Sequence, residues 1–151
     1  VTGVQTCALP ILITENTAFL MANLLQGVVD EGTGRRLRFR YGFKNQIGGK
    51  TGTTQNHSDG WFIGITPDLA GGVWVGAEDR SIHFQNLANG QGASMALPIW
   101  ALFMQKVYAD KSLAVPQSDF QKPNGVNHVL DCGDADREGM TDYDSSDEIF
   151  D

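Results

Sequence analysis

Apolar residues in the first third of the chain recur at spacings of three and four, which is typical of an amphipathic helix. Thr14 is a suitable N-cap, and Glu15 places a negative charge in the first turn, where the helix dipole favours it. Gly32, followed by Gly34, marks the end of this helix. The apolar positions that follow this spacing are Ala18, Leu20, Met21, Leu24, Leu25, Val28 and Val29.

Residues 35–45 interrupt this pattern with five basic side chains set between apolar positions. We expect a solvated turn and extended segment that contains one helical turn. The basic cluster could steer an anionic polymer, but a charged surface face is the simpler interpretation.

Three short strands are predicted next, at residues 46–54, 61–66 and 73–77. A polar turn at residues 55–59 separates the first two, and Pro67-Asp68 and Gly71-Gly72 mark the exit turn of the second. Short turns between segments of alternating apolar and small residues imply an antiparallel meander.

A second long helix is expected at residues 93–109, after a loop rich in Asn and Gly at residues 81–92. Pro98 would either kink this helix or mark its true start. The order helix, meander, helix predicts an α+β fold, an antiparallel sheet meander covered by helices. Both helices can cover one face of the sheet.

Composition divides the chain into unequal parts, although its 151 residues leave room for only one modest domain. Residues 1–111 carry nine Lys/Arg and eight Asp/Glu, whereas residues 112–151 carry two and ten. We predict a domain at residues 13–111 and an acidic, disordered tail at residues 112–151, because the tail cannot bury enough apolar surface to fold. Residues 1–12 lack a clear period and are interpreted as a non-native or linker segment. This charge distribution argues against a nucleic-acid partner.

Metal binding and membrane insertion find little support in the sequence. Cys7 and Cys132 lie near opposite ends and suit neither a disulfide framework nor a metal site, so no metal or cofactor is expected. Residues 134–145 match the first half of a calcium loop, but Ser145 stands where a bidentate Glu is needed. No apolar run reaches the roughly 18 residues of a membrane span.

The most informative motif is Lys50-Thr51-Gly52-Thr53, which combines a cation, two hydroxyls and a glycine within a predicted strand, with Thr54 directly after it. Such a strand can bind a carboxylate while its backbone lies against an extended peptide. Lys50 would supply positive charge, and Thr53 could hydrogen-bond the carboxylate and offer its N–H to an oxyanion hole. Strand alternation places Lys50 and Gly52 on one face and the two threonines on the other, unless an edge position lets them share a cleft.

Simpler interpretations of this region compete. A Lys-Thr-Gly is common by chance and is often a polar strand end. A phosphate-binding P-loop would require glycine where Lys44 stands, and a helix opening at Lys50. The neighbouring His57-Ser58-Asp59 contains the residue types of a hydrolase triad, but adjacent residues cannot converge in that geometry and are typical of a turn.

Several spaced motifs agree in order with a known family: residues 47–54, 59–64 and 73–76, extended back through residues 26–34 and forward to residues 96–100. Over roughly residues 13–110 the chain resembles the C-terminal part of penicillin-binding protein transpeptidase domains, most nearly the class A, bifunctional type. The resemblance implies half of a β-lactamase/transpeptidase-like fold. It also implies a parent enzyme that cross-links peptidoglycan by serine acyl transfer.

Carried over by this resemblance, Lys50 would be catalytic, polarising the site and helping the proton relay. Thr51 and Thr53 would hold the carboxylate of the substrate or of a β-lactam, Gly52 would leave room for it, and Thr54 would complete the substrate-binding strand. The implied partners are the D-Ala-D-Ala end of a peptidoglycan stem peptide and β-lactams. The parent protein is expected to be membrane-anchored, at the outer face of the cytoplasmic membrane or in the periplasm.

The sequence also departs from the family pattern, because it contains neither the Ser-x-x-Lys nor the Ser-x-Asn element. The chain on its own is therefore predicted to be inactive. A fragment of a serine β-lactamase is one alternative, since such enzymes share Lys-Thr-Gly, although the Trp-bearing third strand and residues 96–100 favour the transpeptidase. A noncatalytic module that binds a peptide or partner through its strand edge and acidic tail is another.

Overall fold

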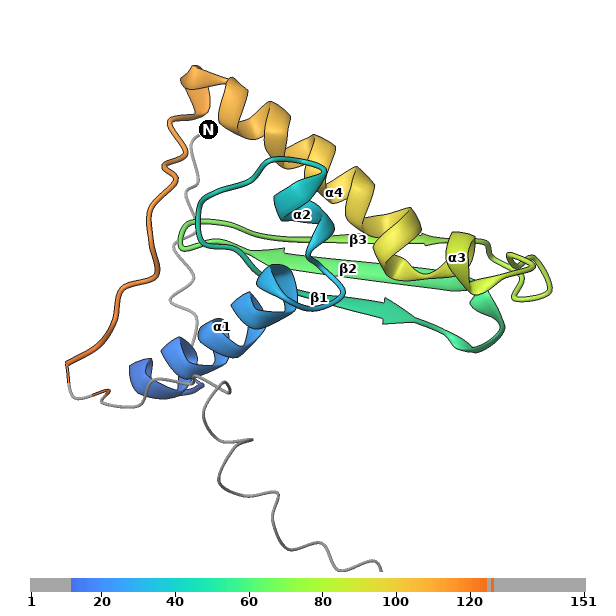
Figure 1. The fold of residues 1–151 in the computed structure, drawn as a ribbon, viewed down its shortest axis with the longest axis horizontal. Helices are drawn as coiled ribbons and strands as arrows, with labels where there is room; N and C mark the ends of the chain where they lie inside the picture. Colours follow the sequence, from blue (N-terminus) through green and yellow to red (C-terminus); the bar gives the residue numbers. More distant parts are fainter. Residues whose placement is uncertain (1–11, 125, 127–151) are drawn as a thin grey trace, which may run out of the picture.

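The computed structural model describes residues 12–124 and 126, and within them the chain forms one antiparallel sheet flanked by helices (Figure 1). The predicted α+β class is confirmed. In chain order the elements are α1 (Glu15–Asp30), α2 (Arg36–Phe39), β1 (Gly48–Thr53), η1 (Gln55–His57), β2 (Asp59–Ile65), β3 (Ala70–Gly76), α3 (Leu87–Gly90), α4 (Gly92–Ala109) and η2 (Lys111–Leu113).

The sheet has the order β1-β2-β3, so among the described residues both outer strands pair only with β2. Both pairings are antiparallel, with Lys50 opposite Ile63 and Phe62 opposite Val73, as the predicted meander requires. β3 begins at Ala70, three residues earlier than predicted. The pair Gly71-Gly72, predicted to form a turn, therefore lies inside a strand.

Packing of α4 explains why the sheet needs glycine at position 71, and also at position 64. Trp100 of α4 is only 2% exposed and packs edge-on against Phe62, with ring centroids 5.4 Å apart. A Cβ on Gly64 would collide with the Trp100 ring, and one on Gly71 would lie 3.3 Å from its Nε1. The same Nε1 donates a hydrogen bond to the Gly71 carbonyl oxygen at 3.1 Å. Glycine is thus needed here so that the indole can approach the sheet backbone.

The first long helix begins where the sequence predicts it, because the Thr14 hydroxyl accepts a hydrogen bond from the Thr17 N–H. α1 packs beside the start of β1, where Leu25 Cβ lies 3.0 Å from the position of a Cβ on Gly48. Val29, near the end of α1, is fully buried in the hydrophobic core. The expectation that both long helices cover one face is therefore corrected: α4 lies across the sheet, whereas α1 flanks β1.

Two short helices occupy the connecting segments. α2 is the helical turn expected in the basic segment. α3 falls in the Asn- and Gly-rich segment predicted to be a loop, and it forms because Asn86 Oδ1 accepts the Asn89 N–H at 3.1 Å. Pro98 does not mark the start of α4, which begins at Gly92 and includes the proline in its interior.

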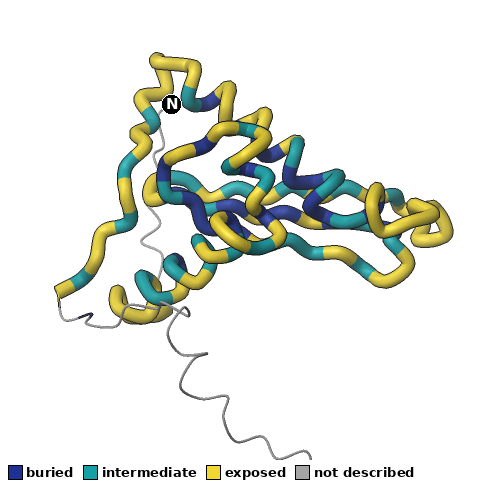
Figure 2. The backbone as a smooth tube through the Cα atoms, in the orientation of Figure 1, coloured by how far each residue is buried: buried dark blue, intermediate teal, exposed yellow. Residues whose placement is uncertain are grey.

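Burial is concentrated between α4 and the sheet, while much of α1, the loops and the C-terminal segment are exposed (Figure 2). The other face of the sheet is contacted by Leu25 of α1 near Gly48 and is largely exposed beyond that point. Its large side chains keep about half of their surface in solvent, namely Trp61 at 45%, Ile63 at 50% and Trp74 at 46% exposed. No helix among the described residues is both long and apolar enough to cross a membrane.

The turn between β1 and β2 depends on the Thr54 side chain. Its hydroxyl accepts the Asp59 N–H at 3.1 Å, reaches the Asp59 carbonyl oxygen at 3.1 Å, and lies 3.0 Å from Ser58 Oγ. Two residues inside this turn, Asn56 and His57, have positive φ values of 64° and 56°. The Thr54 hydrogen bonds therefore close a turn whose backbone is locally strained.

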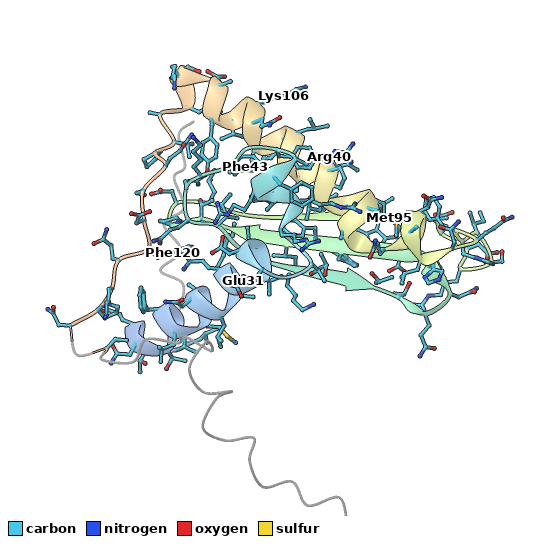
Figure 3. The ribbon with its side chains drawn as sticks, viewed as in Figure 1. Glu31, Arg40, Phe43, Met95, Lys106 and Phe120 are labelled. Atoms are coloured by element: carbon cyan, nitrogen blue, oxygen red, sulfur yellow. The ribbon has the colours of Figure 1, made fainter. Side chains whose placement is uncertain are left out.

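After α4 the chain runs back toward the start of α1 (Figure 1). The Phe120 N–H donates to Gln46 Oε1 at 2.8 Å, and Ser118 Oγ donates to Asp68 Oδ2 at 2.9 Å (Phe120 is labelled in Figure 3). The domain boundary at residue 111 and the disorder of the tail stay predictions. Residues 1–11, both cysteines and the calcium-like segment at residues 134–145 lie outside the described residues.

A glycine-to-alanine pair tests the close approach of Trp100. Gly64→Ala is expected to destabilise the chain by about 1–3 kcal/mol, because the new methyl group forces the indole out of place. Gly27→Ala makes the same chemical change in α1, where a Cβ meets nothing within 4 Å, and is expected to stabilise by about 0.4–1 kcal/mol. Urea unfolding followed by circular dichroism measures both. Equal midpoints for the two variants would contradict the packing described above.

The Thr54 turn gives a second prediction. Thr54→Val removes the hydroxyl and leaves the Asp59 N–H without that acceptor, so we expect a loss of about 1–3 kcal/mol in unfolding free energy. The exposed neighbour Gln55 supplies the control, since Gln55→Ala should change stability by less than about 0.5 kcal/mol. Thermal melts of the two variants decide the matter; a Thr54→Val melt that overlays the wild type would refute the role of the turn.

Candidate functional site

The backbone of β1 presents alternate residues to β2 and to the free edge of the sheet. Thr54 N–H donates to the Asp59 carbonyl oxygen at 3.1 Å, which makes these two residues a hydrogen-bonded pair. In an antiparallel ladder such pairs alternate with pairs whose N–H and C=O groups point outward. The register therefore turns Lys50 and Gly52 toward β2, and Thr51 and Thr53 toward the free edge.

Lys50 brings its charge to this same edge. Its side chain is exposed and belongs to the face that carries Ile63, yet its ammonium donates to the carbonyl oxygen of Thr51 at 2.7 Å. Because the Thr51 carbonyl points outward, the cation lies along the free edge of β1. Strand alternation places Lys50 and the threonines on opposite faces, but the long Lys50 side chain still brings its ammonium to the edge where the threonines lie.

The Thr51 hydroxyl is half-buried and lies 2.9 Å from Thr33 Oγ1, in the segment that links α1 to α2. Either hydroxyl can be the donor in this pair. Thr51 is therefore tied to the end of α1, and the direction of its own proton is not fixed by this contact.

The Thr53 hydroxyl has a partner that can only donate. Gly92 N–H, the first amide of α4, donates to Thr53 Oγ1 at 3.0 Å, while Thr53 itself stays exposed. A Cβ on Gly92 would collide with the carbonyl oxygens of Gly52 and Trp61, so the start of α4 lies directly against the β1–β2 pair. The helix therefore supports the far end of the strand without covering it.

The other two predicted site residues differ in what they can contribute. Gly52 shares a face with Lys50, and a Cβ there would lie 3.3 Å from Trp61 Cβ, so the space beside it is narrow. The hydroxyl of Thr54 is fully engaged in the turn and is not directed at the free edge. The structure thus brings Lys50, Thr51, Gly52 and Thr53 together on one strand edge and places Thr54 at its structural end.

Residues 57–59 form a turn, as the sequence indicates. Ser58 Oγ contacts Thr54 Oγ1, and Asp59 takes part in the same turn through its backbone. His57 Nδ1 is buried and has no hydrogen-bond partner among the described residues. The three side chains are not assembled as a catalytic triad.

Among the titratable groups of the described residues, three have shifted pKa values, and all three lie outside β1. Hydrogen bonds from the Ser81 backbone and side chain lower the pKa of Asp79, and those from the Ser112 side chain and backbone lower the pKa of Asp110. Burial raises the pKa of Tyr108. These shifts reflect turn capping and core packing rather than chemistry at the strand edge.

Sequence reasoning did not predict which residues hydrogen-bond the threonine side chains of β1. Thr33 and Gly92 contact the threonine hydroxyls of β1 from positions 18 and 39 residues away. Thr33 lies in the motif at residues 26–34, but no contact with the strand is predicted for it, and Gly92 lies outside the spaced motifs. Their roles become visible only when the fold brings the segments together.

Comparison with known proteins gives matches over most of the chain. No family model matches it. It is 36% identical over 117 residues to penicillin-binding protein 1A of Pseudomonas aeruginosa, covering 76% of this chain and 13% of the relative. It is also 36% identical over 101 residues to penicillin-binding protein 1A of Aquifex aeolicus, covering 67% of this chain and 12% of the relative.

A solved structure agrees with these sequence matches. The 2.6 Å crystal structure of penicillin-binding protein 1A from Haemophilus influenzae superposes with a TM-score of 0.63 and 29% identity, over 76% of this chain and 17% of the other. The chain thus spans about one eighth of the length of the curated relatives it matches. Over this partial region it is homologous to penicillin-binding protein 1A, a class A penicillin-binding protein.

Proposed function

We propose that the free edge of β1 is the substrate-binding wall of a peptidoglycan transpeptidase site in a longer parent protein. The observation that carries this proposal is the gathering of one ammonium, one fixed hydroxyl and outward backbone N–H groups along four consecutive residues, Lys50 to Thr53. A carboxylate accepts hydrogen bonds only, so a row of donors beside a cation suits it. An extended peptide can lie along the same edge by strand addition.

In this proposal each of the four residues has a defined role. Lys50 supplies the positive charge that favours the substrate carboxylate and helps the proton relay of a serine nucleophile. The Thr53 hydroxyl binds the carboxylate, and its outward N–H is placed to stabilise the oxyanion of the tetrahedral intermediate. Thr51 adds a second hydroxyl. Gly52 has no side chain and therefore leaves room for the substrate beside the strand.

The nucleophile has to come from elsewhere in the parent protein, because the chain has no Ser-x-x-Lys element. The serine would attack the carbonyl between the two D-Ala residues, expel the terminal D-Ala and form an acyl-enzyme. An amine on a neighbouring peptidoglycan strand would then attack the acyl-enzyme, take the acyl group and release the serine. β-Lactams would acylate the same serine. We place the parent at the outer face of the cytoplasmic membrane, where peptidoglycan is assembled.

Binding of a carboxylate-bearing peptide tests the wall directly. An acyl-D-Ala-D-Ala peptide titrated into the chain should shift the amide resonances of β1, and the same peptide with an amidated C-terminus should shift them far less. Thr53→Val should weaken binding of the free carboxylate about tenfold or more, because a hydrogen bond to a charged group is lost. Thr17→Val, which removes a distant exposed hydroxyl and leaves the Thr14 cap in place, is the control. If Thr53→Val binds as the wild type does, a partner-binding module becomes the better account.

Acylation gives a separate prediction. The isolated chain should show no covalent labelling by a fluorescent penicillin on a denaturing gel, because it contains no serine paired with the lysine of a Ser-x-x-Lys element. A full-length penicillin-binding protein in the same reaction provides the positive control. A serine adduct on this chain, located by mass spectrometry, would overturn the proposal that the nucleophile is supplied elsewhere.

A further inference from the structure

We infer that Arg36 is a positioning residue for the candidate site, which acts by holding the first turn of α4 so that the Thr53 hydroxyl is fixed as a hydrogen-bond donor. This inference rests on the proposed function, because it explains how the strand edge selects a carboxylate. It concerns a residue that touches neither the strand nor the place of the substrate.

Arg36 joins two segments that are far apart in sequence. Its Nη1 donates to the Ala93 carbonyl oxygen at 3.0 Å and to Ser94 Oγ at 3.1 Å. The side chain comes from α2 and is half-buried. Both acceptors lie in the first turn of α4, so a single guanidinium group holds the start of that helix.

The start of α4 has no side-chain cap from its own N-cap residue, Gln91. Its first amide, Gly92 N–H, instead donates to Thr53 Oγ1 on the neighbouring strand. The position is narrow as well, since any Cβ on Gly92 would collide with the Gly52 and Trp61 carbonyl oxygens. Arg36 on one side and Thr53 on the other are thus the polar contacts that connect this helix start to the rest of the fold.

This contact sets the polarity of the Thr53 hydroxyl. A backbone N–H can only donate, so Thr53 Oγ1 has to act as the acceptor toward Gly92. The hydroxyl proton is then left to be donated to another group, and a carboxylate is a pure acceptor. The Thr51–Thr33 pair differs, because either hydroxyl can donate there and the Thr51 proton can be taken up internally.

Loss of Arg36 should therefore act on carboxylate recognition through Gly92 and Thr53. When the first turn of α4 is released, the Gly92 amide no longer stays against Thr53 Oγ1. The hydroxyl then rotates freely, so its proton is no longer directed at the carboxylate. We expect the affinity for a free carboxylate to fall, with little change for an amidated ligand.

The test compares Arg36→Met with Arg35→Met. Both remove one positive charge from adjacent positions, but Arg35 is exposed and has no side-chain hydrogen bond among the described residues. Arg36→Met should lower the affinity for acyl-D-Ala-D-Ala about fivefold and leave the amidated peptide within a factor of about two, whereas Arg35→Met should change neither. Arg36→Lys should retain an intermediate affinity, since an ammonium can keep one of the two contacts.

A double-mutant cycle with Thr53→Val separates positioning from general stability. If Arg36 acts through the Thr53 hydroxyl, Arg36→Met should cause no further loss of affinity in the Thr53→Val background. Losses that multiply, or equal losses for the free and amidated peptides, would overturn the inference.

Hydrogen exchange at the Gly92 amide provides a readout that needs no ligand. Exchange should accelerate in both Arg36→Met and Thr53→Val and stay slow in Arg35→Met. Wild-type chain that fails to distinguish the free from the amidated peptide would defeat the proposed function. If the proposed function fails in this way, unchanged exchange of the Gly92 amide in Arg36→Met would refute the positioning role as well. Accelerated exchange would instead support the contacts from Arg36 through Gly92 to Thr53, although their ligand would not be a carboxylate peptide.

Discussion

The close approach of Trp100 to the glycines of the sheet is the contact on which the rest of the structure depends. An indole ring reaches the backbone of β2 and β3 because Gly64 and Gly71 carry no side chains there. The ring also packs against Phe62 and lies 6.2 Å, centroid to centroid, from Phe43, so it connects α4, the sheet and the segment before β1. Because the sheet formed by the described residues has three strands, one large side chain supplies much of the buried contact between the layers.

This contact also determines where the candidate site can form. The position of Trp100 fixes α4 over the sheet, and the helix then extends back to Gly92, beside Thr53. The start of the helix is fastened a second time by Arg36. The hydrophobic core and the strand edge are therefore connected through one rigid element, which is how a binding surface can be held to a defined geometry without being buried.

Local signals in the sequence predicted a good part of this arrangement. The Thr14 cap and the three- and four-residue spacing located α1, because both depend on neighbouring residues only. The Lys50–Thr53 motif is visible in the sequence because it combines a cation, two hydroxyls and a glycine in one predicted strand. Its outward backbone followed only from the observed register, which depends on Thr54 pairing with Asp59.

The features that sequence reasoning missed are long-range. The sequence predicts a turn at Gly71-Gly72 because glycine is a turn residue locally, whereas Gly71 accommodates the indole of Trp100, 29 residues away. The contacts of Arg36 with Ala93 and Ser94 cross 57 and 58 residues and leave no spaced pattern. Arg36 stood among other basic residues, and only the fold distinguishes it from the solvated members of that cluster.

The outer strand β3 has a consequence for handling the isolated chain. Its seven residues, Ala70–Gly76, include no charge and no proline, and among the described residues only one of its two edges is paired. Natural sheets usually guard such an edge with lysine, proline or a bulge, because bare backbone amides template the addition of a foreign strand. The exposed Trp74 side chain adds an apolar surface to this unpaired strand, which favours self-association. We therefore expect strand addition at β3 to limit the concentration at which the chain remains monomeric in solution.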